Sequence, residues 1–328
     1  MSKRHGYLCD KIMTRENMYA AMLKFNSGRD IDCRVEPSWD YADYLLYQMQ
    51  HNFVDLIGRP ARQTIIEAGK IRPLQVPSVN ACIAMIAMWL VCGPFVEARI
   101  HSHSYSSRVG YGGYRAMREV AKFVRENEDG GADWGYFFDI AQCYANLMPP
   151  IAMDRLRTVF KDRRVLWMFD VVLQSAWEGL PIGYPFSHAI ANLILAPLYA
   201  MMLSYKNVSA GFVYMDNHIF FSHYKDTLRN LRPKVERWLE GIGCHMKHDW
   251  QIFEVEDRGA NICGYKVFPD HIKLYRRIWH RIMRNFDTLQ ADWQKKDYLS
   301  LMSRKGWLMG AKKQYSPVFL IEGEYLWK

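Results

Sequence analysis

Apolar residues recur with two different periods along this chain, and the period distinguishes strands from helices. In residues 211–221, Val, Tyr, Ile and Phe flank a polar Asp-Asn pair, the pattern of two short strands joined by a tight turn at Asp216. A second apolar strand, at 134–140, ends beside another carboxylate, Asp139. The two segments predict neighbouring strands of one sheet, each with an acid near its end.

Helical spacing of apolar residues predicts most of the other elements. We expect helices at 14–25, with Thr14 as the cap, and at 39–57, 80–92, 114–126, 151–177, 187–203 and 226–241. We expect a hairpin formed by 62–67 and 69–77, and a last pair of strands near 250–274. From residue 134 onward the order is strand, helix, hairpin, helix, strand, which predicts a split βαβ sheet with helices on one face.

Export and membrane insertion find no support in the sequence. The longest apolar run, 81–92, is too short to cross a bilayer and is followed by Gly93-Pro94, so we expect a buried helix that ends there. The first ten residues lack the apolar stretch of an export signal. Seven cysteines without a close CxxC pair indicate reduced thiols, not a disulfide framework or a zinc site. We therefore expect a cytoplasmic protein with no membrane partner.

Composition and charge narrow the class of partner. With 328 residues, half of them apolar, the chain is long enough to bury a sizeable core. The 43 Lys and Arg exceed the 34 Asp and Glu, which leaves a net charge of +9 and favours a polyanionic partner. A soluble basic protein with no such partner is the alternative.

Asp139 and Asp216 are the main candidates for chemistry. If their strands are neighbours, both side chains emerge at one sheet edge, where two carboxylates repel unless a cation lies between them. Oxygen ligands favour Mg²⁺, and such a pair is typical of two-metal phosphoryl transfer. The alternative for Asp216 is that it only stabilises a turn.

A glycine-containing loop and a helix separate the two acids. In residues 179–193, Gly183 permits close backbone approach and Ser187 can cap the next helix, which suits a loop that cradles a nucleotide or a template base. A plain turn between two helices explains the loop equally well when it is taken alone.

Together, three segments resemble motifs A, B and C of reverse transcriptases: FFDIAQCY at 137–144, GLPIGYPFSHAIANL at 179–193 and YMDN at 214–217. Residues 264–269, GYKVFP, resemble the primer grip, and the N-terminus resembles bacterial enzymes of diversity-generating retroelements. The resemblance implies an α+β right-hand polymerase fold: an N-terminal extension and fingers at 1–130, a split βαβ palm at 131–270 and a short helical thumb at 271–328.

The same resemblance assigns roles to individual residues. It implies metal binding by Asp139, Asp216 and Asn217, with catalysis by the two aspartates and an added ligand from the Ile140 carbonyl. Tyr144 resembles the steric gate that excludes a ribose 2′-hydroxyl, and Gly183 belongs to the nucleotide-binding loop. Lys70, Arg72 and Arg108 resemble finger residues that hold a triphosphate, although each is also explained as a surface charge.

Three positions depart from the family pattern. Asn217 stands where motif C usually has a second aspartate, so the site has one negative charge fewer. Ile182 occurs where many relatives have Gln, as it does in the diversity-generating enzymes, but His188 stands where that group commonly has Gln. The position of the lysine that often serves as general acid in motif D is occupied by Trp250, with Lys247 and His248 nearby, which leaves proton donation unassigned.

Residues 273–293 combine an apolar stripe with a cluster of cations, the pattern of an amphipathic helix. In the family's layout this helix is the thumb, and its arginines would bind template-primer phosphates: Arg276, Arg277, Arg281 and Arg284. Tyr105, Tyr111 and Tyr114 are candidates for stacking on bases, with ordinary packing as the alternative.

We therefore expect an RNA-directed DNA polymerase that uses dNTPs and Mg²⁺, or Mn²⁺, to make DNA on a structured non-coding RNA. Its expected settings are anti-phage defence or a diversity-generating retroelement, with repetitive or untemplated synthesis as a variant of the reaction, in a homo-oligomer or with an accessory protein. Two alternatives remain open: a pseudo-polymerase that acts as an RNA-binding scaffold, and a maturase-like RNA chaperone.

Overall fold

The computed structural model of the chain describes residues 4–67, 70–127, 130–276, 278, 280, 320, 321, 324 and 325. The helices of the described part are α1 (Cys9–Ile12), α2 (Arg15–Asn26), α3 (Trp39–His51), α4 (Phe53–Ile57), α5 (Val79–Glu97), α6 (Gly113–Arg125), α7 (Cys143–Asn146), α8 (Pro149–Val159), α9 (Arg163–Ser175), α10 (Ser187–Leu203), α11 (Lys225–Glu240) and α12 (Val255–Arg258), with a 3-10 turn at Ile31–Cys33. The strands are β1 (Ala61–Glu67), β2 (Lys70–Val76), β3 (Trp134–Ala141), β4 (Val208–Tyr214), β5 (Asn217–Ser222), β6 (His245–Met246), β7 (Gln251–Glu254), β8 (Ala260–Ile262), β9 (Tyr265–Val267), β10 (Ile272–Leu274), β11 (Leu320–Ile321) and β12 (Glu324–Tyr325).

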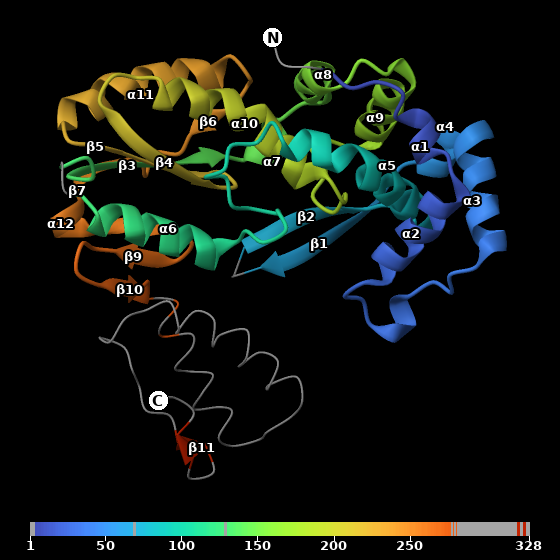
Figure 1. The fold of residues 1–328 in the computed structure, drawn as a ribbon, viewed down its shortest axis with the longest axis horizontal. Coiled ribbons are helices and arrows are strands. Elements are labelled where there is room, and N and C mark those ends of the chain that lie inside the picture. Colours follow the sequence, from blue (N-terminus) through green and yellow to red (C-terminus); the bar gives the residue numbers. More distant parts are fainter. Residues whose placement is uncertain are drawn as a thin grey trace. The chain divides into compact units, whose positions relative to one another are not determined.

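The chain forms two compact units, and each takes segments from separate parts of the sequence. The first comprises 1–101, 141–197 and 238–245, and the second comprises 102–140, 198–237 and 246–328. The division into 1–130, 131–270 and 271–328 stays a prediction. Figure 1 shows the elements of each unit in sequence colours.

A five-stranded sheet in the second unit, packed against helices, confirms the α+β prediction. Its strand order is β4-β5-β3-β6, and β7 also pairs with β3. The predicted hairpin is β4 and β5, with Tyr214 opposite Asn217. The turn is where the sequence predicted it, and its left-handed residue is Met215, with φ 57°, directly before Asp216.

Helices pack against both faces of this sheet, so the prediction of helices on one face is wrong. Neighbouring strand residues point to opposite faces. On β5, Phe221 lies 5.3 Å from Phe123 of α6, while Phe220 lies 5.5 Å from Tyr199 of α10 (ring centroids). Figure 1 shows α6 on one side of the strands and α11 on the other. The unbroken apolar run in β5 is typical of a strand buried on both faces.

The apolar helix α5 is longer than predicted. It runs from Val79 to Glu97 through Gly93-Pro94, and Ser78 caps it by accepting a hydrogen bond from the Ala81 N–H. A proline near the end of a helix removes only one internal hydrogen bond, and α5 continues past it. Among the described helices, α5 alone is long and apolar enough to cross a membrane, but 61% of its apolar window is buried in the protein. This burial is typical of a core helix.

Two predicted long helices are each divided in two. Asn52, with φ −132° and ψ 34°, separates α3 from α4, and a break near Phe160 separates α8 from α9. The Asp162 carboxylate then caps α9 and also accepts hydrogen bonds from Leu8 and Cys9 at the N-terminus. Caps that accept such tertiary contacts are not visible in helical periodicity. The predicted Thr14 cap of α2 is confirmed.

His218 is buried within the central sheet. Its side chain is 1% exposed, and its ring stacks on Phe138 with the centroids 4.8 Å apart. Neither ring nitrogen has a hydrogen-bond partner among the described residues. Burial lowers the pKa of His218 to about 3, because a charged imidazolium would lose its hydration here.

We expect His218 to make the fold acid-sensitive. Below the ordinary histidine pKa of about 6.5 the unfolded chain takes up a proton that the folded chain does not, so stability falls as pH falls from about 6.5 toward 3. Between pH 7 and pH 5 the unfolding free energy of both proteins falls, and the fall should be about 2 kcal/mol smaller in His218→Phe than in the wild type. Urea denaturation at both pH values measures this difference. The exposed His245→Phe is the control, and an equal loss in all three proteins would contradict the prediction.

Candidate active site

The two candidate aspartates meet at the end of the central sheet. Asp139 pairs with Asn217 across β3 and β5, and the Ile140 N–H donates to the Asp216 carbonyl at 3.2 Å. The Asn217 amide nitrogen donates to Asp216 Oδ1 at 3.2 Å. Asp139 is the more buried acid, with 17% of its side chain exposed against 30% for Asp216. Strand register thus brings Asp139, Asp216 and Asn217 together, as the sequence predicted.

Lys247 also belongs to this cluster, and sequence reasoning did not assign it a role. Its Nζ lies 2.7 Å from Asp139 Oδ2 and 4.0 Å from Asp216 Oδ2. Its backbone N–H donates to the Asp139 carbonyl at 2.8 Å, which fixes the start of the side chain beside β3. Trp250, the residue aligned with the motif D lysine, instead packs under the Arg232 guanidinium, 4.0 Å from its ring centroid. The signal available in the sequence was a lysine three residues before the aligned position.

The electrostatics of the pair favour a hard cation. Burial, with a contribution from the Asp216 charge, raises the pKa of Asp139 to about 6, although Lys247 opposes this shift. Asp139 Oδ1 is buried and has no hydrogen-bond partner among the described residues. A divalent cation would satisfy that oxygen and relieve the remaining repulsion, so the residues fit Mg²⁺ or Mn²⁺.

The protein ligands alone would not complete a metal centre. No group of three or more His, Cys, Asp or Glu side chains in the described part of the chain could hold a metal ion. Two carboxylates and one amide leave coordination positions for water, a backbone carbonyl or substrate oxygens. Incomplete protein coordination is usual for Mg²⁺ sites that act on phosphates.

Removing the Lys247 ammonium should destabilise the metal-free protein and strengthen metal binding. Lys247→Met keeps the alkyl chain but leaves two carboxylates without their counter-ion, at a cost of about 1–2 kcal/mol for this partly exposed cation. Thermal unfolding in EDTA should show a lower Tm for the variant, and Mn²⁺ should raise its Tm more than that of the wild type. Exposed Lys206→Met is the control. Equal Tm values in EDTA would contradict the role given to Lys247.

In the first unit, Tyr144 is held by two neighbours. Its hydroxyl shares a hydrogen bond with His188 Nδ1, and the two rings meet edge to face at 5.2 Å. Its carbonyl accepts from the Leu180 N–H at 2.8 Å, which connects it to the glycine loop. The predicted steric gate and the unusual His188 are thus in direct contact.

Gly183 lies where the loop approaches strand β2. It has φ 121°, and a Cβ at this position would lie 2.4 Å from the Gln75 carbonyl oxygen. The Gln75 N–H donates to the Ile182 carbonyl at 2.8 Å, so loop and strand are joined by backbone. The predicted need for glycine is confirmed, but the close approach is to the protein's own strand.

Gly183→Ala should destabilise the protein by about 3 kcal/mol or more, since it combines backbone strain with a clash against backbone. Gly28→Ala is a matched control: Gly28 also has a positive φ, 80°, but has open space around it. We expect a cost of about 1 kcal/mol there. Chemical denaturation of both variants measures the difference, and similar costs would show that the contact with β2 is unimportant.

The remaining predicted residues are distributed over both units. Lys70 and Arg72 are on β2, opposite Glu67 and Ile65 of β1, so the predicted hairpin is confirmed. In the second unit, Arg108 donates to the Ser104 carbonyl at 3.0 Å and lies 4.0 Å from the Tyr111 ring centroid, contacts that order its loop.

The primer-grip and thumb residues lie at the end of the second unit. Residues 264–269 include β9, which pairs with β8 and β10. Arg276 is exposed and its Nε donates to His280 Nε2 at 3.1 Å. Arg277, Arg281 and Arg284, and most of the predicted thumb helix, lie outside the described residues.

A family model matches residues 68–267 of the chain. Its description is "Reverse transcriptase (RNA-dependent DNA polymerase)". The match contains the three motifs and both aspartates of the candidate site.

Individual proteins give weaker similarities. Protein YkfC of Escherichia coli (strain K12) is 28% identical over 148 residues, which cover 42% of this chain and 39% of YkfC. A truncated apo telomerase from Candida tropicalis has a TM-score of 0.50 at 14% identity, over 66% of this chain and 55% of the other. Apo telomerase from the same organism gives 0.52 at 9% identity, over 82% and 67%. A complex of that telomerase with a TWJ fragment of telomeric RNA gives 0.52 at 8% identity, over 81% and 56%.

These matches differ in what they establish. At such low identity the structural similarity shows the fold alone. The chain spans 39% of YkfC and 55% of the truncated telomerase, so less than two thirds of either. The family match therefore carries more weight than any single relative.

Proposed function

The chain belongs to the reverse transcriptase family, and from this premise we propose that it is an RNA-directed DNA polymerase that makes DNA from dNTPs. One observation carries the proposal: Asp139 and Asp216 meet at the end of β3 and β5, and one buried carboxylate oxygen has no partner among the described residues. This is the arrangement that metal-assisted phosphoryl transfer needs.

Each residue of the cluster has a proposed part in the reaction. Asp139 and Asp216 would hold Mg²⁺ or Mn²⁺, with the Ile140 carbonyl as an added ligand. When bound, the cations would neutralise triphosphate charge and activate the primer 3′-hydroxyl. Asn217 contacts Asp216 through its amide nitrogen, so it orients that carboxylate, and its oxygen becomes a ligand if the amide is rotated. Lys247 is the ammonium in contact with the pair, and we assign it the proton donation to the leaving pyrophosphate.

Nucleotide selection is proposed for the first unit. Tyr144 would exclude the ribose 2′-hydroxyl and so favour deoxynucleotides, while the loop at Gly183 would border the nascent base pair. Lys70 and Arg72 would bind the triphosphate. In the second unit, triphosphate binding is likewise proposed for Arg108. Arg276, Arg277, Arg281 and Arg284 would contact template-primer phosphates.

The family and the altered motifs support a proposal for the biological setting. We propose a structured non-coding RNA as template, in anti-phage defence or a diversity-generating retroelement, in the cytoplasm. Repetitive or untemplated synthesis, a homo-oligomer and an accessory protein belong to the same proposal.

Primer extension tests the reaction. Purified protein with its co-purified RNA and labelled dNTPs should incorporate label in Mg²⁺ or Mn²⁺. Asp139→Asn, which removes the charge but keeps the shape, should lower incorporation at least about a hundredfold. If the wild type incorporates no more than Asp139→Asn in either metal, the polymerase proposal fails.

The Asn217→Asp variant distinguishes an active polymerase from a pseudo-polymerase that acts as an RNA-binding scaffold. In an active site the added carboxylate should increase metal affinity, so incorporation should saturate at a lower Mg²⁺ concentration. A pseudo-polymerase that only binds RNA would show no incorporation with either residue, while its RNA binding would persist without metal.

A further inference from the structure

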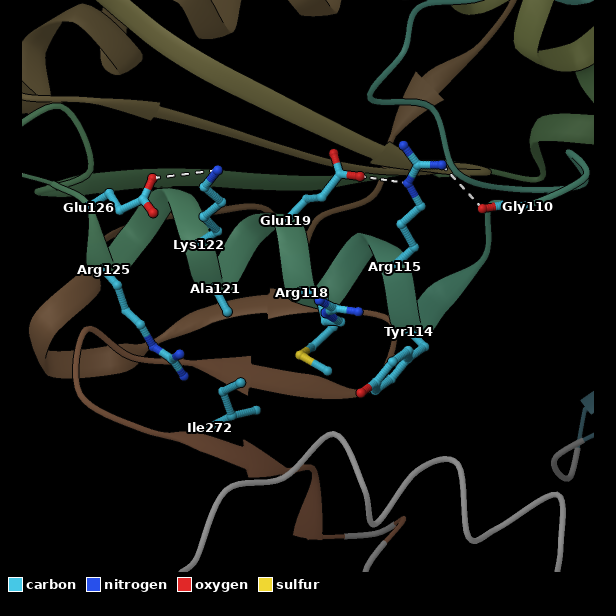
Figure 2. Close-up of a pocket in the computed structure, with 11 residues that line it drawn as sticks. Gly110, Tyr114, Arg115, Arg118, Glu119, Ala121, Lys122, Arg125, Glu126 and Ile272 are labelled. Atoms are coloured by element: carbon cyan, nitrogen blue, oxygen red, sulfur yellow. Dashed lines mark hydrogen bonds and ion pairs between the residues drawn. The ribbon is translucent and has the colours of Figure 1, made fainter.

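Helix α6 borders a groove that the proposed active site does not use. The groove has a volume of about 800 Å³ and is lined by Gly110, by Ile272 of β10 and by α6. The charged residues of α6 that line it are four cations and two acids: Arg115, Arg118, Lys122, Arg125, Glu119 and Glu126. Buried Met117, Ala121 and Ile272 contribute its apolar surface. Figure 2 shows Arg125 extending from the helix on the side of Ile272, away from the Glu119 and Arg115 side chains.

The charges of α6 form two stripes that differ in their partners. In the first stripe every cation faces an acid: Arg115 binds Glu119 at 2.6 Å, and Lys122 lies 4.0 Å from Glu126. Glu119 also accepts a 2.6 Å hydrogen bond from the buried Tyr105 hydroxyl. These i,i+4 pairs neutralise the first stripe within the protein.

The second stripe carries cations without acids. Arg118 and Arg125, seven residues apart, lie on one face of the helix about 10 Å from each other along its axis. Both are exposed, and among the described residues neither takes part in an ion pair. Tyr114, one turn before Arg118, is 46% exposed at the same face. The groove thus contains two guanidinium groups without an acidic partner in the described part of the chain and an exposed aromatic ring, and the Arg118 guanidinium lies over that ring at 5.9 Å from its centroid.

We propose that this groove binds the sugar-phosphate backbone of a single-stranded nucleic-acid segment. Arg118 and Arg125 would each contact a phosphate, and the Tyr114 ring would stack on an unpaired base. The preference for an anion rests on the groove alone, and the choice of nucleic acid over an acidic protein rests on the proposed function. The C-terminal segment 281–328 is a poor occupant, because its nine Lys and Arg exceed its five Asp and Glu.

The test compares two double variants that remove equal charge from the same helix. Arg118→Gln/Arg125→Gln alters the second stripe, and Arg115→Gln/Lys122→Gln alters the first. Fluorescence anisotropy with a labelled 20-nucleotide single-stranded RNA, at several salt concentrations and in EDTA without dNTPs, measures binding. Circular dichroism and thermal unfolding establish that both variants fold.

We expect the second-stripe variant to bind at least fivefold more weakly at 0.1 M salt and to lower the slope of log K against log salt by about 1.4, the value for two lost phosphate contacts. The first-stripe variant should stay within twofold of the wild type. Tyr114→Ala should weaken binding of the single strand but not of a duplex of the same length.

Equal weakening by both double variants would overturn the proposal, because it would indicate a general charge effect. Poly-Glu binding, measured in the same way, serves as a comparison. If the second-stripe variant binds RNA as the wild type does but loses poly-Glu binding, the proposal is overturned in favour of an acidic protein partner. Since binding is measured without metal or nucleotides, absence of polymerase activity leaves this result intact. Conversely, if the enzyme is active and its RNA affinity is unchanged by the Arg118→Gln/Arg125→Gln variant, the proposed function stands and the proposal for this groove fails.

Discussion

The repulsion between Asp139 and Asp216 is the constraint on which the candidate site depends. Antiparallel pairing of β3 and β5 places Asp139 opposite Asn217, so the neighbouring Asp216 is brought beside it. Coulomb repulsion between two carboxylates is strong in a partly buried setting. Burial, with a contribution from this repulsion, raises the pKa of Asp139. The sheet can hold this arrangement because it gains its stability elsewhere, from apolar packing on both faces.

That packing explains why the acids stay at the end of the strands. The side chains of Phe138, Phe220 and Phe221 are fully buried, and helices on both faces exclude water from the middle of the sheet. Charged groups would be far more costly there than at the turn, where Asp216 keeps 30% exposure. The same burial leaves His218 uncharged between aromatic rings. The hydrophobic core and the candidate site are therefore two parts of one pattern of burial.

Local features of the fold were predictable from the sequence, because they depend on neighbouring residues. Helix α10 begins and ends where periodicity placed it, and the hairpin at Asp216 follows from turn residues between apolar strands. Gly183 was also identified, since its positive φ needs glycine. The helix break near Phe160 was missed because a tertiary contact, between the Asp162 cap and the N-terminus, accompanies it. The break at Asn52 was missed as well.

The site itself was predictable only in part. Asp139, Asp216 and Asn217 were found through motifs that lie on paired strands. Lys247 was noted only as a neighbour of the motif D position. Its contact with Asp139 was missed because it depends on how the chain passes along β3 before β7 begins, and no local pattern encodes that register. The two stripes of α6 were equally hidden, since the sequence predicted a helix at 114–126 but not which of its cations would face acids.

Lys247 and Asn217 together set the net charge of the metal-free cluster. Two carboxylates and one ammonium leave the metal-free cluster with a single net negative charge, whereas an aspartate at position 217 would leave two. Each added buried charge without a partner costs stability, so the asparagine reduces the repulsion that Lys247 has to offset. The same substitution weakens the attraction for a divalent cation. If the proposed metal site is correct, Asn217 would therefore shift the balance of the site toward the metal-free, lysine-bound state, and metal concentration would set the fraction of active protein.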